Sequence, residues 1–261
     1  MKFLPYFFLI IILSCATGKN KTKSSSPTLF AVSWFQNSGE AKALFYQGYY
    51  VATEELKKIV QVNKKAKTDR RPLAVVLDLD ETVLDNSPYN ATLIQKGGSF
   101  PTGWSEWCAA AHAKALPGAK AFLDYAHQNK VEIFYVSNRE ESAKESTFKN
   151  LLNLQIPVKL ENMLLKQKSS GKEDRRLTIA QRFNIALLIG DNLNDFSHKF
   201  EKLGAIDRKK TVEQSSAEFG PKYIILPNPM YGDWEGSIYQ YDWKLPETEK
   251  HSLHEKQLET F

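Results

Sequence analysis

Short apolar runs alternate with longer amphipathic stretches over most of the chain. Runs rich in branched apolar residues predict buried strands at residues 73–77, 131–136, 163–165, 185–189 and 223–226. Apolar residues at helical spacing predict helices over residues 39–62, 119–129, 141–154, 173–183 and 195–203. Because strands and helices alternate, we expect an α/β fold: a doubly wound, Rossmann-like parallel sheet with its functional residues at the carboxyl ends of the strands.

The N-terminus carries an apolar run at residues 3–13. As a helix it would cover roughly 16 Å, about half of the hydrocarbon core of a bilayer, so it predicts a signal peptide and not a membrane span. The run ends in Ser14-Cys15, which resembles the lipobox of bacterial lipoproteins. That resemblance implies cleavage before Cys15 and a lipid on its side chain. The alternative is an ordinary secretory signal in which the cysteine is incidental.

Composition shifts along the chain divide it into segments. Residues 16–28 are small, polar and lysine-bearing, as in a flexible linker. The insertion at residues 81–117 follows the first strand, where a lid can form. We expect a smaller, mainly helical cap from this insertion and residues 34–62. The predicted segments are a signal peptide (1–14), a lipidated cysteine with its linker (15–33), one folded domain (34–243) and a polar tail (244–261).

Overall composition excludes several classes of protein. With 261 residues, 42% hydrophobic and 25% charged, the chain is neither disordered nor a coiled coil. Its net charge of +5 is compatible with small anionic ligands but too small to argue for a nucleic-acid polymer. The two cysteines, Cys15 and Cys108, exclude a disulfide-stapled fold.

Polar residues follow each of the first four predicted strands. They are Asp78 and Asp80 after the first, Ser137, Asn138 and Arg139 after the second, Lys172 after the third, and Asp191 and Asp195 after the fourth. Taken singly, such residues are common as helix caps, turns or solvated loops. Because parallel strands end at the same edge of a sheet, the four sets are expected to converge. Two carboxylates two residues apart are costly to hold together unless they share a cation.

The motifs at these strand ends resemble the haloacid dehalogenase (HAD) superfamily of phosphatases, over residues 73–203. A closer resemblance, to the class C acid phosphatases, extends over residues 34–243. That family includes outer-membrane lipoprotein acid phosphatases that act as 5′-nucleotidases, and the lipobox fits this group independently. The motifs that carry it are DLDETVLDNSPY (78–89), WxxW (104–107), SNR (137–139), GDNLNDF (190–196) and NPMYGDWE (228–235).

The resemblance implies a Mg²⁺ ion, which takes hard oxygen ligands. Its ligands would be the side chains of Asp78 and Asp191 and the backbone carbonyl of Asp80, with Asp195 close by to hold a metal-bound water or to orient Lys172. Asp78 would be the nucleophile that forms an aspartyl-phosphate. Asp80 would be the general acid and then the general base, which calls for a pKa raised by burial near Asp78.

The same resemblance implies further catalytic residues. Ser137 and Asn138 would donate hydrogen bonds to the transferring phosphoryl group, and Lys172 would neutralise its charge. Lys166 and Lys168 compete with Lys172 for this role. The spacing of this lysine-rich loop is one residue longer than the family pattern, because of Gly171.

Substrate binding is expected from Trp104, Tyr231 and Arg139, the aromatic rings stacking on a base or ring. The expected activity is hydrolysis of small phosphate monoesters, nucleoside 5′-monophosphates first. Two alternatives stay open: a narrow phosphatase for sugar or other small phosphates, and a surface lipoprotein that only binds. Ala16 after the cysteine favours attachment to the outer membrane of a bacterial envelope. The oligomeric state is left open, a homodimer included.

Overall fold

The structure is a computed structural model of the chain and describes residues 28–65 and 71–261. Its centre is a five-stranded sheet built from β1 (Leu73–Leu77), β4 (Glu132–Glu140), β5 (Met163–Lys166), β6 (Asn184–Gly190) and β7 (Tyr223–Ile225). All four pairings are parallel, and the order across the sheet is β5-β4-β1-β6-β7. The predicted signal peptide and Cys15 lie outside the described residues.

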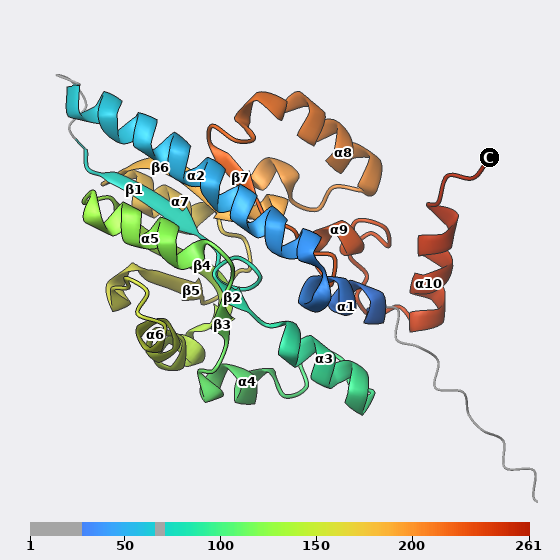
Figure 1. Ribbon diagram of the computed structural model, residues 1–261. Coiled ribbons are helices and arrows are strands. Elements are labelled where there is room, and N and C mark those ends of the chain that lie inside the picture. The colour runs from blue at the N-terminus through green and yellow to red at the C-terminus, as the bar shows by residue number, and fades with distance from the viewer. Residues whose placement is uncertain (1–27, 66–70) are drawn as a thin grey trace, which may run out of the picture.

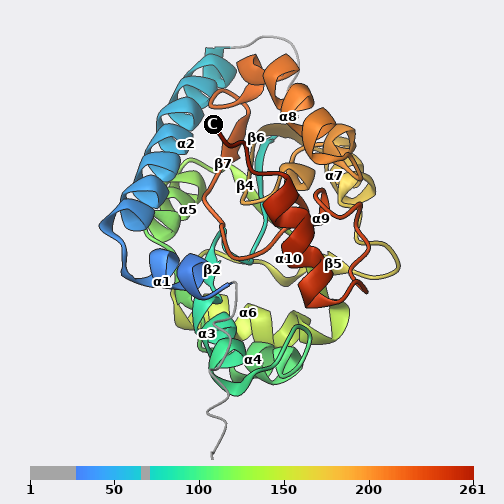
Figure 2. The ribbon, with the colours of Figure 1, turned by 90° about the vertical axis from the view of Figure 1, so that its right-hand side faces the viewer.

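Helices cover both faces of this sheet (Figure 1). On one side lie α2 (Gly39–Lys65), α5 (Ala119–Gln128) and α6 (Lys144–Asn153), and on the other lie α7 (Glu173–Ala180) and α8 (Ala205–Gln214), as Figure 2 also shows. The side chains of β1 alternate between the two apolar clusters, Val75 and Leu77 on one face, Ala74 and Val76 on the other. Both faces are therefore buried, which explains the unbroken apolar run and confirms the predicted fold class.

A smaller cap lies beyond the carboxyl end of β1. It consists of α1 (Leu29–Asn37), α3 (Ser87–Lys96), α4 (Trp104–Ala110) and a ribbon of β2 (Leu84–Asp85) with β3 (Lys114–Ala115). The structure differs from the prediction in its N-terminal part. Helix α2 packs on α5, β6 and β7 and so belongs to the layer over the sheet, whereas α1 packs on α3. Helix α1 also begins inside the stretch expected to be linker up to residue 33.

The segment after β6 corrects the sequence prediction. In place of a helix over residues 195–203 it forms two 3₁₀ turns, Leu193–Asp195 and His198–Phe200. The reason is a reciprocal cap: the Asn192 side chain accepts from the backbone N–H of Asn194, and Asp195 Oδ2 accepts from the N–H of Asn192. Helix α8, which follows, was not predicted because its sequence AIDRKKTVEQ has few apolar residues.

The chain ends in α9 (Asp233–Gly236) and α10 (Glu247–Lys256), the second of which forms from the predicted polar tail. Helix α10 lies at the periphery, beside the C-terminus (Figure 1). Among the residues described, none of the helices combines the length and the apolar character needed to cross a membrane.

Candidate active site

The carboxyl ends of β1 and β6 bring the first and fourth motifs together. The backbone N–H of Asp78 donates to the carbonyl of Ile189 at 3.0 Å, which continues the parallel pairing past the end of β1. Gly190 then lets the chain turn closely: a Cβ atom there would lie 2.2 Å from Asp195 Oδ2. The sheet therefore sets the spacing of the acidic residues on the two loops, and glycine is required at this turn.

Three acidic side chains meet at this edge, and we call Asp78, Asp191 and Asp195 the carboxylate cluster. One oxygen atom from each lies within 4.8 Å of the others. The Lys172 ammonium donates to Asp195 Oδ1 at 2.6 Å and also to Asp78 Oδ1. The side chains of Lys172, Asp78 and Asp195 are 7%, 8% and 6% exposed. The cluster thus places three carboxylates against one ammonium in a site with little solvent.

Burial and crowding shift the ionisation of these groups. Burial raises the pKa of Asp78 to about 7; Lys172 opposes this rise, while Asp195 and Asp80 add to it. Burial also raises the pKa of Asp191 well above its ordinary value, and the charges of Asp195 and Asp78 raise it further. For Lys172, burial disfavours the charged form, but Asp195 and Asp78 outweigh it and leave its pKa above the ordinary value. The cluster therefore carries excess negative charge that a cation would stabilise.

The carboxylate cluster fits a divalent metal ion. Its donors are hard oxygen atoms, and Asp191 is already oriented, because Thr82 Oγ1 donates to its Oδ1 at 3.2 Å and Asn228 Nδ2 to its Oδ2 at 2.9 Å. Asp195 joins Asp78 and Asp191 in the cluster and also accepts from Lys172, the residue that it is expected to orient. The Asp80 side chain is not part of this cluster, and metal binding by the Asp80 backbone carbonyl stays a prediction.

Asp80 has different surroundings, formed by three side chains that we call the Asp80 clamp: Arg139, Asn86 and Ser137. Asp80 Oδ1 accepts from Arg139 Nε at 2.9 Å and from Asn86 Nδ2 at 2.8 Å. Ser137 Oγ lies 3.4 Å from Oδ2. Oδ1 is therefore held by two side chains through short contacts, whereas the contact of Oδ2 with Ser137 is longer.

The buried Arg139 side chain anchors this clamp. It is 1% exposed, forms an ion pair with Asp80 at 2.8 Å, and donates to Thr147 Oγ1 at 3.0 Å and to Asn86 Oδ1 at 3.2 Å. We predict from the sequence that Arg139 binds substrate, but the structure places its guanidinium behind Asp80, away from solvent. Its position favours support of Asp80, because every one of its donors faces the protein interior.

The other predicted polar residues lie around the same edge. Strand β4 extends through Glu140, beyond the predicted residues 131–136, so Ser137 and Asn138 lie within it; Ser137 is buried and Asn138 is exposed. Of the three candidate lysines, Lys172 reaches the carboxylate cluster, whereas Lys166 forms an ion pair with Glu140 at 2.6 Å and Lys168 is exposed on the loop. The geometry thus separates Lys172 from its competitors.

The predicted aromatic residues occupy two places. The Trp104 ring packs against Tyr89 at 5.0 Å and lies 5.5 Å from the Arg139 guanidinium. Tyr231 is half-buried in the loop after β7, three residues beyond the Asp191 partner Asn228. The Trp104 ring therefore lies near the residues that hold Asp80, Tyr231 packs against the larger apolar core, and the contact of both rings with substrate stays a prediction.

Sequence reasoning overlooked several residues that organise the site. Asn86 holds Asp80 and also accepts from Trp107 Nε1 at 2.8 Å, and Asn228 holds Asp191. Asn86 lies within the motif DLDETVLDNSPY and Asn228 within NPMYGDWE. The motifs therefore point to these two positions, but they do not reveal which carboxylate each asparagine holds. Arg175, on the first turn of α7, gave no signal because it looks like an ordinary surface residue of an amphipathic helix.

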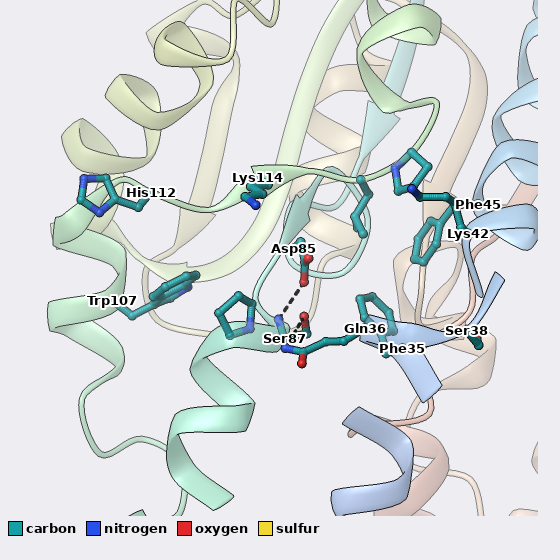
Figure 3. Close-up of a pocket in the computed structure, with 13 residues that line it drawn as sticks. Phe35, Gln36, Ser38, Lys42, Phe45, Asp85, Ser87, Trp107, His112 and Lys114 are labelled. Carbon is teal, nitrogen blue, oxygen red and sulfur yellow. Dashed lines mark hydrogen bonds between the residues drawn. The ribbon is translucent and has the colours of Figure 1, made fainter. Parts of the chain in front are cut away.

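A separate pocket lies on the α1 side of the cap (Figure 3). It has a volume of about 420 Å³, and its lining includes Phe35, Phe45, Trp107, His112 and Lys114. No member of the carboxylate cluster lines it. Cys108, in the same insertion, is buried, and burial raises the pKa of its thiol to about 11, which fits a structural and unreactive cysteine. The pocket is therefore distinct from the acidic site.

Comparison with known proteins identifies the family of this chain. Residues 13–234 match the family described as HAD superfamily, subfamily IIIB (Acid phosphatase). The class C acid phosphatase from Bacillus anthracis is 42% identical in sequence, with a TM-score of 0.84 over 90% of this chain and 97% of that one. Its structure with tungstate bound has the same identity and coverage and a TM-score of 0.83. The chain belongs to this family of acid phosphatases and is a phosphomonoester hydrolase.

Proposed function

We propose that this acid phosphatase hydrolyses nucleoside 5′-monophosphates with Mg²⁺, through a phosphoryl group transferred to Asp78. The observation that carries the proposal is the contrast between two carboxylates two residues apart. Asp78 lies among acidic groups beside Lys172, whereas Asp80 is held by Arg139 and Asn86. A covalent mechanism needs these two roles: a nucleophile that attacks the phosphorus, and a proton carrier that reaches the leaving oxygen on the opposite side of it.

Charge is the main obstacle to the first step. A carboxylate that approaches a phosphate dianion at about 4 Å, with an effective dielectric constant near 20, meets a repulsion of roughly 8 kcal/mol. Left uncompensated, this would cost about six orders of magnitude in rate. Asp78, Asp191 and Asp195 would hold the Mg²⁺ ion, which supplies positive charge and orients the phosphate when bound. Lys172 adds a second positive charge at the same edge.

Asp80 moves the proton. Because Oδ1 accepts from Arg139 and Asn86, the proton given to the leaving oxygen is carried on Oδ2. In the second step the same oxygen takes a proton from the water that attacks the phosphorylated Asp78, so that Asp80 is restored. The clamp holds the carboxyl group in one orientation through both steps.

Donors of the protein hold the transferring phosphoryl group. Ser137 and Asn138 lie in the last part of β4, with the Ser137 hydroxyl 3.4 Å from Asp80 Oδ2, and Lys172 forms an ion pair with Asp78. These groups would stabilise the charge of the equatorial oxygens during transfer. The tungstate bound by the relative from Bacillus anthracis supports an oxyanion site in this family.

The preference for nucleotides rests on aromatic side chains near the site. Trp104 and Tyr231 offer ring faces that could stack on a base, an interaction of roughly 1–3 kcal/mol. The test is phosphate release from a panel of nucleoside monophosphates and sugar phosphates, with Mg²⁺ and with a chelator. We expect faster release from nucleotides and loss of activity in the chelator. Equal rates on sugar phosphates would contradict the nucleotide preference, and full activity in the chelator would contradict the metal.

For location, we propose a lipid anchor on Cys15 in the bacterial outer membrane. The support is the sequence alone: an apolar run that ends in Ser14-Cys15, followed by a polar linker. Labelled palmitate should enter the wild-type protein and not a Cys15→Ser variant. A mature N-terminus other than Cys15 would contradict the anchor.

A further inference from the structure

Arg175, in the first turn of α7, ties three parts of the active-site edge together. Its two terminal nitrogens donate to the carbonyls of Ser137 (2.6 Å) and Leu164 (3.1 Å) and to Asn138 Oδ1 (2.7 Å). They also donate to the carbonyls of Ser170 (3.3 Å) and Gly171 (3.2 Å), just before Lys172. One guanidinium thus joins β4, β5 and the lysine loop.

This arrangement is unusual for an arginine that only stabilises a helix. A positive charge in the first helical turn is unfavourable with respect to the helix dipole. Among residues 28–65 and 71–261, no carboxylate forms an ion pair with Arg175. Its donors instead serve backbone carbonyls and one side-chain amide, all at the catalytic edge. The planar guanidinium can donate to several acceptors at once from fixed directions, and the single ammonium of a lysine cannot reproduce this geometry.

The bond to Asn138 has a direct consequence for the phosphate site. Because Asn138 Oδ1 accepts from Arg175, its amide oxygen faces α7 and its Nδ2 donors are turned to the other side. The bond to the Ser137 carbonyl fixes the peptide group between Ser137 and Asn138. The bonds to Ser170 and Gly171 fix the backbone that leads into Lys172. Two predicted phosphate donors are therefore oriented by one side chain.

We propose that Arg175 is a positioning residue for phosphoryl transfer, which orients the Asn138 amide and the Lys172 loop toward the phosphate held at Asp78. The proposal rests on the site assigned under the proposed function. Arg175 itself does not touch the reacting atoms. A displacement of about 1 Å in such donors is enough to lower the rate by about 100-fold.

The test uses Arg175→Lys in the full chain, with p-nitrophenyl phosphate and Mg²⁺. We expect kcat to fall by about 30- to 100-fold with a smaller change in KM, because the donors act mainly during transfer. Arg182→Lys, an exposed arginine just beyond α7, is the matched control and should keep wild-type activity. Thermal unfolding of each variant checks the fold. Should Arg175→Lys not fold, Arg175→Gln, which keeps a planar amide donor, takes its place.

A double-mutant cycle separates positioning from general support of the structure. If Arg175 acts through Asn138, Arg175→Lys should lower kcat at least fivefold less in an Asn138→Ala background than in the wild type. An equal loss in both backgrounds, or wild-type activity of Arg175→Lys, would overturn the inference. Asp78→Asn is measured alongside: if it stays active, the proposed site fails, whereas an inactive Asp78→Asn with an active Arg175→Lys rejects only the role of Arg175.

Discussion

Asp78 and Asp80 are two residues apart in the chain, yet they lie in opposite electrostatic surroundings. Asp78 shares a buried site with Asp191 and Asp195, and Lys172 forms ion pairs with Asp78 and Asp195. Asp80 forms an ion pair with Arg139 and accepts a second hydrogen bond from Asn86. The difference shows how neighbours give the same residue type two roles, one that attracts cations and one whose carboxyl group is held in a fixed orientation.

The strongest test of this contrast removes the charge of Asp78. Asp78→Asn should lower kcat by at least about 10,000-fold, because an amide is a poor nucleophile and because the substitution removes a carboxylate proposed to bind the metal. Steady-state hydrolysis of p-nitrophenyl phosphate measures the loss. The control is Asp174→Asn, an exposed acidic residue on α7, which should keep its activity. A comparable loss of kcat in Asp78→Asn and Asp174→Asn would show that Asp78 has no special role in catalysis.

A weaker clamp should impair proton transfer in particular. Asn86→Ala removes one donor to Asp80 Oδ1 and should lower kcat on alkyl phosphates by about 10- to 100-fold. The loss on p-nitrophenyl phosphate should be smaller, because its leaving group needs no proton. Rates on a series of leaving groups measure this effect. An equal loss on all of them would show that Asn86 does not act through Asp80.

The carboxylate cluster should make the metal-free protein sensitive to pH. Burial raises the pKa of Asp78 from 3.8 to about 7, so the folded state holds this proton more tightly than the unfolded state. The stability that this group contributes is present below about pH 4 and is lost as the pH rises to about 7, on the order of a few kcal/mol. Urea unfolding in a chelator should show this fall.

Two comparisons test whether Asp78 causes this fall in stability with pH. In Asp78→Asn the fall should be reduced, and a divalent cation should stabilise the wild type more than the variant at pH 7. A fall of the same size in both proteins would assign the pH dependence to other groups.

The smallest effect is expected from Trp107→Phe. This change removes one donor to Asn86 Oδ1, while Arg139 Nη2 still donates to the same oxygen. We expect a loss in kcat of only a few-fold, on the basis of one neutral hydrogen bond worth about 1 kcal/mol. A loss as large as that of Asn86→Ala would show that the indole is essential to the Asp80 clamp.

The convergence of the strand-end motifs could be predicted from the sequence, because the carboxyl ends of parallel strands lie at the same edge of a sheet. Asp78 and Asp191 meet since β1 and β6 are neighbours, and Lys172 reaches them from the loop before α7. Side-chain partners could not be predicted in this way. Arg139 and Asn86 are 53 residues apart, and the pairing of both with Asp80 depends on how the cap closes on β4. The 3₁₀ turns after β6 escaped prediction because a local cap at Asn192 overrides helical spacing.

The central claim, that Asp78 takes the phosphoryl group and Asp80 handles protons, is tested most directly by trapping the intermediate. Asp80→Asn is mixed with p-nitrophenyl phosphate and Mg²⁺, quenched in acid within milliseconds, digested and mapped by mass spectrometry. Attack on this substrate needs no proton, but hydrolysis of the intermediate needs a base. We therefore expect a burst of p-nitrophenol and a phosphoryl group on the peptide that carries Asp78. A phosphoryl group on another residue, or turnover without any burst or trapped phosphoryl group, would contradict the claim.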